Sequence, residues 1–330
     1  MRSSRYILRS IRNAKRVAII THRNADPDAL CSAYALGYLL RKLKRGVEVH
    51  LVAPQGISKV AKRIVEHLHI RLHDPQNLEE YDIVFTIDAN TLLQLAEYGT
   101  RLRDYEGVVI VIDHHASDPR TLEVATHAII DDKAVSVSQI VYSLYKRSKI
   151  PVSRPVAWAL FLGIAYDTRH FALATSTSFK IAGDLVRRGV DAAKAIRLLH
   201  VPITESERIA RLKGAQRLKI TRVGRWVLAS TYVGSHQASV ARGLIMLGAD
   251  VAVVSGGKKG EVQVSLRSTQ DFYDSTGTHL GTDVARAVGE LIHGAGGGHA
   301  IAAGIRGKDE EESVLTKCLQ VLTEQLSKKL

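Results

Sequence analysis

Three apolar segments in the first third of the chain each end abruptly in carboxylate and imidazole side chains. These segments are residues 16–20 (RVAII), 82–87 (DIVFTI) and 107–112 (GVVIVI), and the polar residues that follow them begin at His22, Asp88 and Asp113. Runs this rich in β-branched residues are typical of parallel strands buried on both faces. Open α/β sheets bind ligands at the carboxyl ends of their strands, so we expect these polar side chains to share one site.

Strand and helix patterns alternate through this part of the chain. A helical pattern from Ala29 to about Leu43 follows the first apolar segment, and residues 47–53 and 57–67 read as a strand and a helix. This alternation predicts a doubly wound parallel sheet. After about residue 134 the spacing becomes helical as far as residue 199.

Strand patterns return near the carboxyl end of the chain. We expect strands over residues 226–233, 249–255 and 261–268, helices over 237–246 and 282–292, a flexible glycine-rich loop at 294–299 and a charged helix from about Glu310. The predicted fold class is therefore α/β, in three parts. These are a catalytic domain over residues 1–190, a helical linker over 191–220 and a smaller α/β domain over 221–330.

The composition restricts the partners and the compartment. A formal net charge of +13 favours a polyanionic partner, although a basic surface without a partner is the alternative. Cys31 and Cys318 are too few for a disulfide framework and suit a reducing, cytoplasmic compartment. No apolar stretch approaches the roughly 20 residues that span a bilayer, so we expect no membrane partner. The basic start of the chain, residues 2–16, is interpreted as a packed first helix.

The polar residues after the strands are typical ligands of divalent cations. They comprise an H-x-x-x-D-x-D motif and three further donors: His22, Asp26, Asp28, Asp88, His114 and Asp167. Carboxylates and imidazoles without thiolates suit Mn²⁺, Mg²⁺ or Fe²⁺ better than structural zinc. The donors exceed the needs of one ion, so two ions that share a bridging carboxylate are the economical arrangement. Such a pair hydrolyses phosphoesters.

Each of these residues also has a structural explanation when taken alone. Asp28 or Asp88 could cap a helix, Asp167 could form a helix-end hydrogen bond with Thr168, and a lone histidine after a strand is often structural. The metal hypothesis depends on their joint occurrence after three separate strands.

These motifs resemble those of the DHH phosphoesterase superfamily, in the subgroup with a carboxyl-terminal DHHA1 domain. The resemblance is carried by H-x-x-x-D-x-D at 22–28, Asp88, the tripeptide Asp113-His114-His115, Asp167 within G-I-x-x-D-T, the segment SLRS (265–268) and GGGHAIAAG (296–304). The motifs span nearly the whole chain in family order. Ala25 and Pro27 replace the proline and glycine often found around the first aspartate, which leaves the expected ligands intact.

The resemblance implies a role for each motif residue. Both ions would be Mn²⁺, with Mg²⁺ as the alternative. His22, Asp26 and Asp88 would hold one ion, and Asp28, Asp88, His114 and Asp167 would hold the other. His115 would contact the substrate phosphate and help to protonate the leaving oxygen, while Asp113 would orient an imidazole or a metal-bound water. The implied substrate-binding residues are Arg267, Gly296, Gly297, Gly298 and His299.

The resemblance also implies an activity, with alternatives. We expect a two-metal phosphodiesterase or exonuclease of short oligonucleotides that can also act on 3′-phosphoadenosine 5′-phosphate; a homodimer is compatible with this. The runner-up is a RecJ-like exonuclease of longer single-stranded DNA or RNA. A cyclic or linear dinucleotide phosphodiesterase is a further alternative. A non-catalytic replication scaffold is disfavoured because every expected metal ligand is present.

Overall fold

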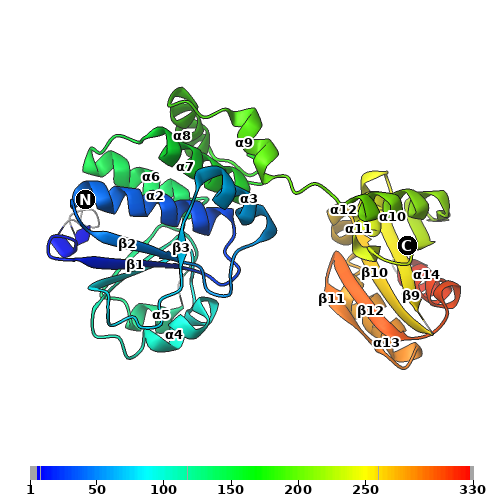
Figure 1. Cartoon of the computed structure of the whole chain (residues 1–330). Helices are drawn as coiled ribbons and strands as arrows, with labels where there is room; N and C mark the ends of the chain where they lie inside the picture. The colour runs from blue at the N-terminus through cyan, green and yellow to red at the C-terminus, as the bar shows by residue number, and fades with distance from the viewer. Residues whose placement is uncertain (1–5, 8, 117, 259, 328–330) are drawn as a thin grey trace. The chain divides into compact units, whose positions relative to one another are not determined.

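The structure, a computed structural model, describes residues 6–7, 9–116, 118–258 and 260–327 (Figure 1). The chain divides into two compact units, Met1–Val201 and Pro202–Leu330. Helix α9 (Ala192–Leu199) packs against α7 (Arg154–Asp167) in the first unit, and α10 (Glu205–Gln216) packs against α11 (Gln237–Met246) in the second. Helices α9 and α10 therefore belong to different units.

The first unit is built on a six-stranded sheet in the order β3-β2-β1-β4-β5-β6, with every neighbouring pair parallel. Its strands are β1 (Arg16–Thr21), β2 (Glu48–Val52), β3 (Leu72–His73), β4 (Ile83–Ile87), β5 (Val108–Asp113) and β6 (His127–Ile130). The predicted doubly wound α/β fold is thus confirmed. The strand order reverses between β1 and β4, and this topological switch point is where such sheets bind ligands.

Helices cover both faces of this sheet (Figure 1). Successive residues of β1 show the consequence, since Val17 and Ile19 enter one core while Ala18 and Ile20 enter the other. All four side chains are fully buried, which explains the unbroken apolar run. The helical elements of the unit, besides α7 and α9, are α2 (Pro27–Leu43), α3 (Lys59–Leu68), η1 (Leu92–Leu95), α4 (Glu97–Arg101), α5 (Pro119–Glu123), α6 (Val137–Ser148) and α8 (Ser176–Arg187).

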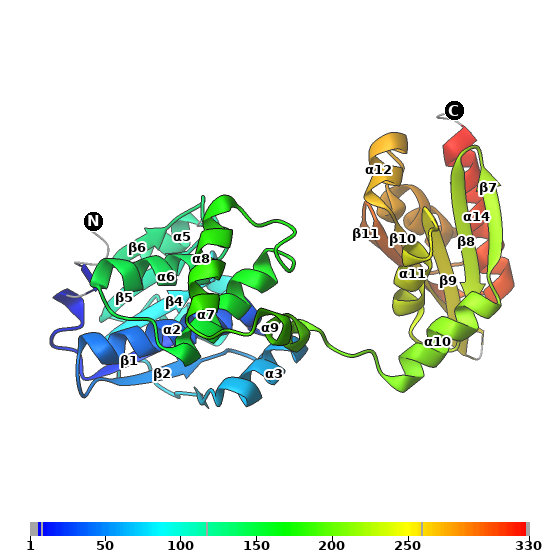
Figure 2. The same ribbon diagram turned by 90° about the horizontal axis from the view of Figure 1, so that it is seen from above.

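The second unit contains a mixed six-stranded sheet in the order β11-β12-β10-β9-β8-β7, in which only β8 and β9 pair in parallel. Its strands are β7 (Lys219–Val223), β8 (Trp226–Tyr232), β9 (Val251–Lys258), β10 (Glu261–Ser268), β11 (Ala295–His299) and β12 (Ala302–Lys308). Helix α14 (Glu311–Ser327) packs against β8 and β9 (Figure 2). The other helical elements are α12 (Gln270–Thr276), η2 (Leu280–Ala285) and α13 (Arg286–Leu291).

The expectation of a flexible loop at residues 294–299 is wrong. Residues Ala295–His299 form the edge strand β11, which pairs with β12. The strand packs closely on η2, and a Cβ at Gly296 would collide with the Ala285 carbonyl oxygen. Glycine is depleted in strands because it offers no side chain to pack. Here the close approach requires it, and the usual strand pattern is lost.

The start of the chain contributes to the first core, where Ile7, Ile11 and Ala14 are buried. Residues 2–5 and 8 of the expected first helix lie outside the described residues. Among the helices that the structure describes, none combines the length and apolar character needed to cross a bilayer.

Candidate metal centre

The carboxyl ends of β1, β4 and β5 lie side by side, because these three strands are neighbours in the sheet. The backbone of Asp88 continues the ladder, and its N–H donates to the Ile112 carbonyl at 3.0 Å. Asp88 then adopts a left-handed conformation with φ of 56°. A non-glycine residue in this region is strained, and such strain clusters at functional sites. The turn directs the Asp88 carboxylate toward both neighbouring strand ends.

A first group of donors gathers on the β1 side of Asp88. Ligand atoms of His22, Asp26 and Asp88 lie within 4.8 Å of one another. His22 donates its Nδ1–H to the Arg23 carbonyl at 2.9 Å, which leaves the Nε2 lone pair free. That Nε2 lies 3.8 Å from Asp26 Oδ1. The backbone therefore fixes the imidazole in the orientation that a metal ligand requires.

Asp26 also caps helix α2. Its Oδ1 accepts hydrogen bonds from the N–H groups of Asp28 at 2.9 Å and Ala29 at 3.1 Å. Burial alone would raise the pKa of Asp26, but His22 and these two N–H groups outweigh burial and lower it. The alternative in which Asp28 caps this helix is wrong, since Asp26 is the capping residue.

Asp28 instead connects α2 to the start of α6. Its carboxylate is fully buried and accepts from the backbone N–H groups of Val137 at 2.6 Å and Ser138 at 3.0 Å. These groups have no partner within their own helix, and a carboxylate is favourable at a helix N-terminus. Gly163 of α7 makes this approach possible, because a Cβ there would collide with Ser138 Oγ.

A second group of donors gathers around His114. Ligand atoms of Asp28, His114 and Asp167 lie within 4.8 Å of one another. His114 Nδ1 donates to the Ala134 carbonyl at 3.2 Å, and its Nε2 lies 3.4 Å from Asp167 Oδ2 and 3.7 Å from Asp88 Oδ1. Asp88 is therefore close to both groups of donors.

His115 is held by its neighbour in the tripeptide. The fully buried Asp113 accepts from the backbone N–H of His115 at 2.8 Å and from its ring Nδ1 at 2.9 Å. This hydrogen bond raises the pKa of His115. The His115 side chain remains 53% exposed, so its ring can meet a substrate from solution while Asp113 fixes its orientation.

The carboxylates of the site repel one another. Burial, followed by the charges of Asp28 and Asp26, raises the pKa of Asp88 well above its ordinary value and that of Asp167 to about 9. Burial likewise raises the pKa of Asp28. Within the described part of the chain, histidines are the ion-pair partners of Asp26, Asp88, Asp113 and Asp167. No lysine or arginine of the described residues pairs with these four carboxylates or with Asp28. The protein itself does not neutralise this negative charge.

Unpartnered buried atoms test whether divalent cations fit this site. Asp88 Oδ1, Asp113 Oδ2 and His114 Nε2 are buried and have no hydrogen-bond partner. Buried polar atoms are nearly always satisfied in folded proteins, so orphans that converge on one site indicate a missing ligand. Carboxylate oxygens and imidazole nitrogens without thiolate are a donor set that Mn²⁺ and Mg²⁺ accept. The residues present fit divalent cations.

The remaining residues predicted from the sequence lie in the second unit. Arg267 of β10 and His299 of β11 both pair with Ala302 of β12, so they stand in one row on the two strands that flank β12. The three glycines differ. Packing requires Gly296 and Gly298, whereas a Cβ at Gly297 would meet no atom within 4 Å. Only Gly297 leaves open space above the sheet.

Three polar residues escaped the sequence analysis. Ser138 Oγ is buried beside Asp28, and Gln263 and Arg306 line a cavity on the second sheet. Arg306 could have been found from the alternation of small, apolar and charged residues in 302–308, had this segment been interpreted as a strand.

The fold and this site together define a class of protein. A doubly wound sheet that collects aspartates and histidines for divalent cations at its switch point is typical of metal-dependent phosphoesterases. The family model "DHH family, N-terminal domain" matches residues 16–164, and the "DHHA1 domain" model matches residues 234–328. The chain belongs to the DHH family of metal-dependent phosphoesterases.

Relatives of this chain match over most of its length. It is 31% identical over 324 residues to an uncharacterized protein of Methanocaldococcus jannaschii, and the alignment covers 94% of this chain and 95% of that protein. It is 27% identical over 281 residues to the cyclic-di-AMP phosphodiesterase GdpP of Geobacillus thermodenitrificans, covering 79% of this chain and 42% of that protein. An exopolyphosphatase-related protein from Bacteroides fragilis shares the fold, with a TM-score of 0.66, 19% identity and coverage of 98% and 95%.

Proposed function

We propose that this phosphoesterase is a two-metal phosphodiesterase that hydrolyses short oligonucleotides and also accepts 3′-phosphoadenosine 5′-phosphate. The observation that carries the proposal is the position of Asp88 beside two separate groups of donors. One carboxylate between two such groups is the arrangement that two divalent cations need in order to share a ligand.

Each group has the donors for one cation. His22, Asp26 and Asp88 would hold the first, and the second would be held by Asp88 with Asp28, His114 and Asp167. Bound there, two divalent cations supply positive charge to a phosphoryl group and lower the pKa of a water nucleophile. Mn²⁺ is our choice and Mg²⁺ the alternative, since both accept carboxylate and imidazole ligands.

His115 supplies the proton chemistry that belongs to the protein itself. Its hydrogen bond to Asp113 leaves Nε2 as the ring atom that can meet a substrate. The raised pKa favours the protonated form of the ring. A protonated imidazole can bond a phosphate oxygen and then donate its proton to the leaving oxygen. Asp113 acts by positioning the ring.

The second unit supports a nucleotide substrate. Arg267 offers a planar fork suited to phosphate, and the His299 ring can stack on a base or bond a phosphate oxygen. The open space above Gly297 lies in the row next to them. A net charge of +13 also favours a polyanion over a small neutral ester.

One finding favours a second candidate. The alignment with the cyclic-di-AMP phosphodiesterase GdpP covers 79% of this chain, so it must include parts of both units. Hydrolysis of cyclic or linear dinucleotides is therefore the alternative. RecJ-like digestion of long single strands remains a further outcome of the test below.

A hydrolysis panel with Mn²⁺ tests the proposal. It compares di- to pentaribonucleotides, long single-stranded RNA and DNA, 3′-phosphoadenosine 5′-phosphate, cyclic dinucleotides and pyrophosphate. We expect the highest kcat/KM on the short strands, and a loss of activity in Asp88→Asn that the exposed Asp104→Asn does not show. Processive digestion of long strands, or a preference for cyclic dinucleotides, would overturn the choice of substrate. No hydrolysis of any ester would favour a scaffold.

A further inference from the structure

The second sheet leaves part of one face uncovered. Val262, Val264 and Leu266 of β10 enter the core together with Ala303 and Ile305 of β12. Side chains alternate along a strand, so the residues between them project to the opposite face. On that face α11 covers β9 and contacts β10. The face of β12 and β11 beyond it carries exposed residues, among them Gly297, Gly304 and Arg306.

The strand register arranges the residues of this face in rows. Row one contains Arg267, Ala302 and His299, row two contains Ser265, Gly304 and Gly297, and row three contains Gln263, Arg306 and Ala295. Row one holds the residues to which the proposed function assigns the substrate. Rows one and three are four residues apart along β10, which is about 13 Å at ~3.3 Å per residue.

Row two is open because two of its residues are glycines, and packing does not require glycine at either position. A Cβ at Gly304 would meet only the Val264 carbonyl oxygen, at 3.6 Å, and one at Gly297 would meet nothing within 4 Å. Neither glycine has a positive φ. The fold would therefore accept larger residues in row two. A cavity of about 300 Å³ occupies this position, lined by both glycines and by residues of row three.

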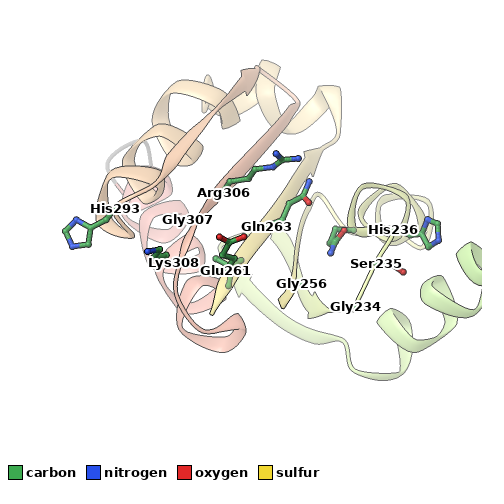
Figure 3. Close-up of a pocket in the computed structure, with 13 residues that line it drawn as sticks. Gly234, Ser235, His236, Gly256, Glu261, Gln263, His293, Arg306, Gly307 and Lys308 are labelled. Atoms are coloured by element: carbon green, nitrogen blue, oxygen red, sulfur yellow. The ribbon is translucent and has the colours of Figure 1, made fainter. Parts of the chain in front are cut away.

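A second cavity continues from row three. It measures about 650 Å³ and is lined by Gln263, Arg306, residues 234–236 that precede α11, and Gln237 at the start of that helix. In Figure 3 Arg306 and Gln263 project from adjacent strands toward the same side. Among the contacts of the described residues, the Arg306 guanidinium has no hydrogen-bond or ion-pair partner. An unpaired guanidinium beside a cavity is a site for an anion.

The charge of the cavity lining changes at its far end. Arg306 and Lys308 are the arginine and lysine of this lining, and Glu261 is its one carboxylate among the lining residues that the structure describes. Glu261 pairs with Lys308 in the row after row three. Beyond Arg306 the charges of Glu261 and Lys308 therefore offset each other. The attractive part of the face ends at row three.

We propose that row three is a subsite for the nucleotide units beyond the one bound at row one, with Arg306 on a phosphate and Gln263 beside it. The open row two lets the strand cross between them. This inference rests on the proposed function and deepens it. Since 13 Å exceeds the reach of a single nucleotide unit, the subsite makes the enzyme favour strands longer than a dinucleotide.

Chain-length dependence tests the subsite. Initial rates with Mn²⁺ give kcat/KM for a 5′-labelled tetraribonucleotide and for a diribonucleotide, and the ratio of the two values is the readout. We expect Arg306→Ala to lower this ratio roughly ten-fold, because a charge-assisted phosphate contact is lost. Gly304→Val should lower it as well, by filling row two, while its thermal unfolding temperature does not fall.

Arg222→Ala is the matched control. Arg222 lies on β7, at the opposite edge of the same sheet, and its loss removes the same charge. We expect the ratio to stay at the wild-type value in this variant. An unchanged ratio in Arg306→Ala, or a fall of equal size in Arg222→Ala, would overturn the subsite. A wild-type protein that cleaves no oligonucleotide would instead overturn the proposed function.

Discussion

Asp167→Asn should stabilise the protein when divalent cations are removed. The folded metal-free protein raises the pKa of Asp167 from 3.8 to about 9, first by burial and then through the charges of Asp28 and Asp26. A raised carboxyl pKa contributes stability below pH 3.8 that is lost as the pH rises through about 9. The metal-free wild type should therefore lose stability over this range, and the asparagine variant should not.

The size of the effect follows from the shift. Between pH 3.8 and pH 7.5 the unscreened pKa shift of Asp167 would lower the free energy of unfolding by roughly 5 kcal/mol. The Asp167 side chain is 17% exposed, so water reaches the carboxylate, and we expect about 1–3 kcal/mol. Asparagine carries an amide group that can donate to Asp28 in place of the protonated carboxyl, and it cannot ionise at the last residue of α7.

Urea unfolding at pH 7.5 with EDTA measures the difference. The chain has two tryptophans, and Trp158 lies in α7, so a Trp226→Phe background lets fluorescence report the first unit. The midpoint should rise by roughly 0.5–1.5 M in Asp167→Asn. With Mn²⁺ at about 100 times its Kd the wild type should gain about 2.7 kcal/mol and the variant much less.

Asp104→Asn, at an exposed carboxylate, is the control for this experiment. It should leave the midpoint unchanged in both conditions. A metal-free Asp167→Asn protein that is less stable than the wild type would refute the claim that the carboxylates repel one another until cations bind.

Three further changes have distinct expected results. Asp113→Asn should lower the pKa of His115, so the alkaline limb of the kcat–pH profile should move to lower pH while kcat falls on the order of 10²-fold; an unmoved limb would contradict the positioning role. Gly163→Ala should cost about 1–3 kcal/mol in thermal unfolding and weaken Mn²⁺ binding, because its Cβ would collide with Ser138 Oγ; Gly183→Ala, whose Cβ would meet only Arg187 Nη1 at 3.9 Å, should show neither loss. Asp184 has its pKa lowered to about 2 by Tyr142 and Arg188, so Asp184→Asn should cost about 1–2 kcal/mol at pH 7, and a difference that did not shrink toward pH 3 would contradict this.

The sequence was sufficient for the elements that build the candidate metal centre. The strands β1, β4 and β5 were predictable because a strand buried on both faces must be apolar throughout. Their convergence followed from the parallel sheet, since neighbouring carboxyl ends share one edge. The sequence could not decide between a cap and a ligand at Asp26 and Asp28. Asp26 caps α2 and also faces His22, and the two roles use one carboxylate.

Other features depend on contacts that are distant in the sequence. The link from Asp28 to Val137 joins residues 109 positions apart, and no local pattern encodes it. Strand β11 consists mostly of glycine, so neither strand propensity nor alternation could reveal it. Because neither β11 nor β12 was predicted from the sequence, the pairing of residues across these strands was unknown. The position of Arg306 in a row beside Gln263 could therefore not be inferred.

The stoichiometry of Mn²⁺ binding tests the central claim most directly. Equilibrium titration of the metal-free protein at pH 7.5 should give two ions per chain for the wild type and for Asp104→Asn. Asp88→Asn should lose at least one ion together with hydrolysis of a diribonucleotide, because Asp88 adjoins both donor groups. Wild-type protein that binds fewer than two ions, or an Asp88→Asn protein that binds two and remains active, would contradict the account.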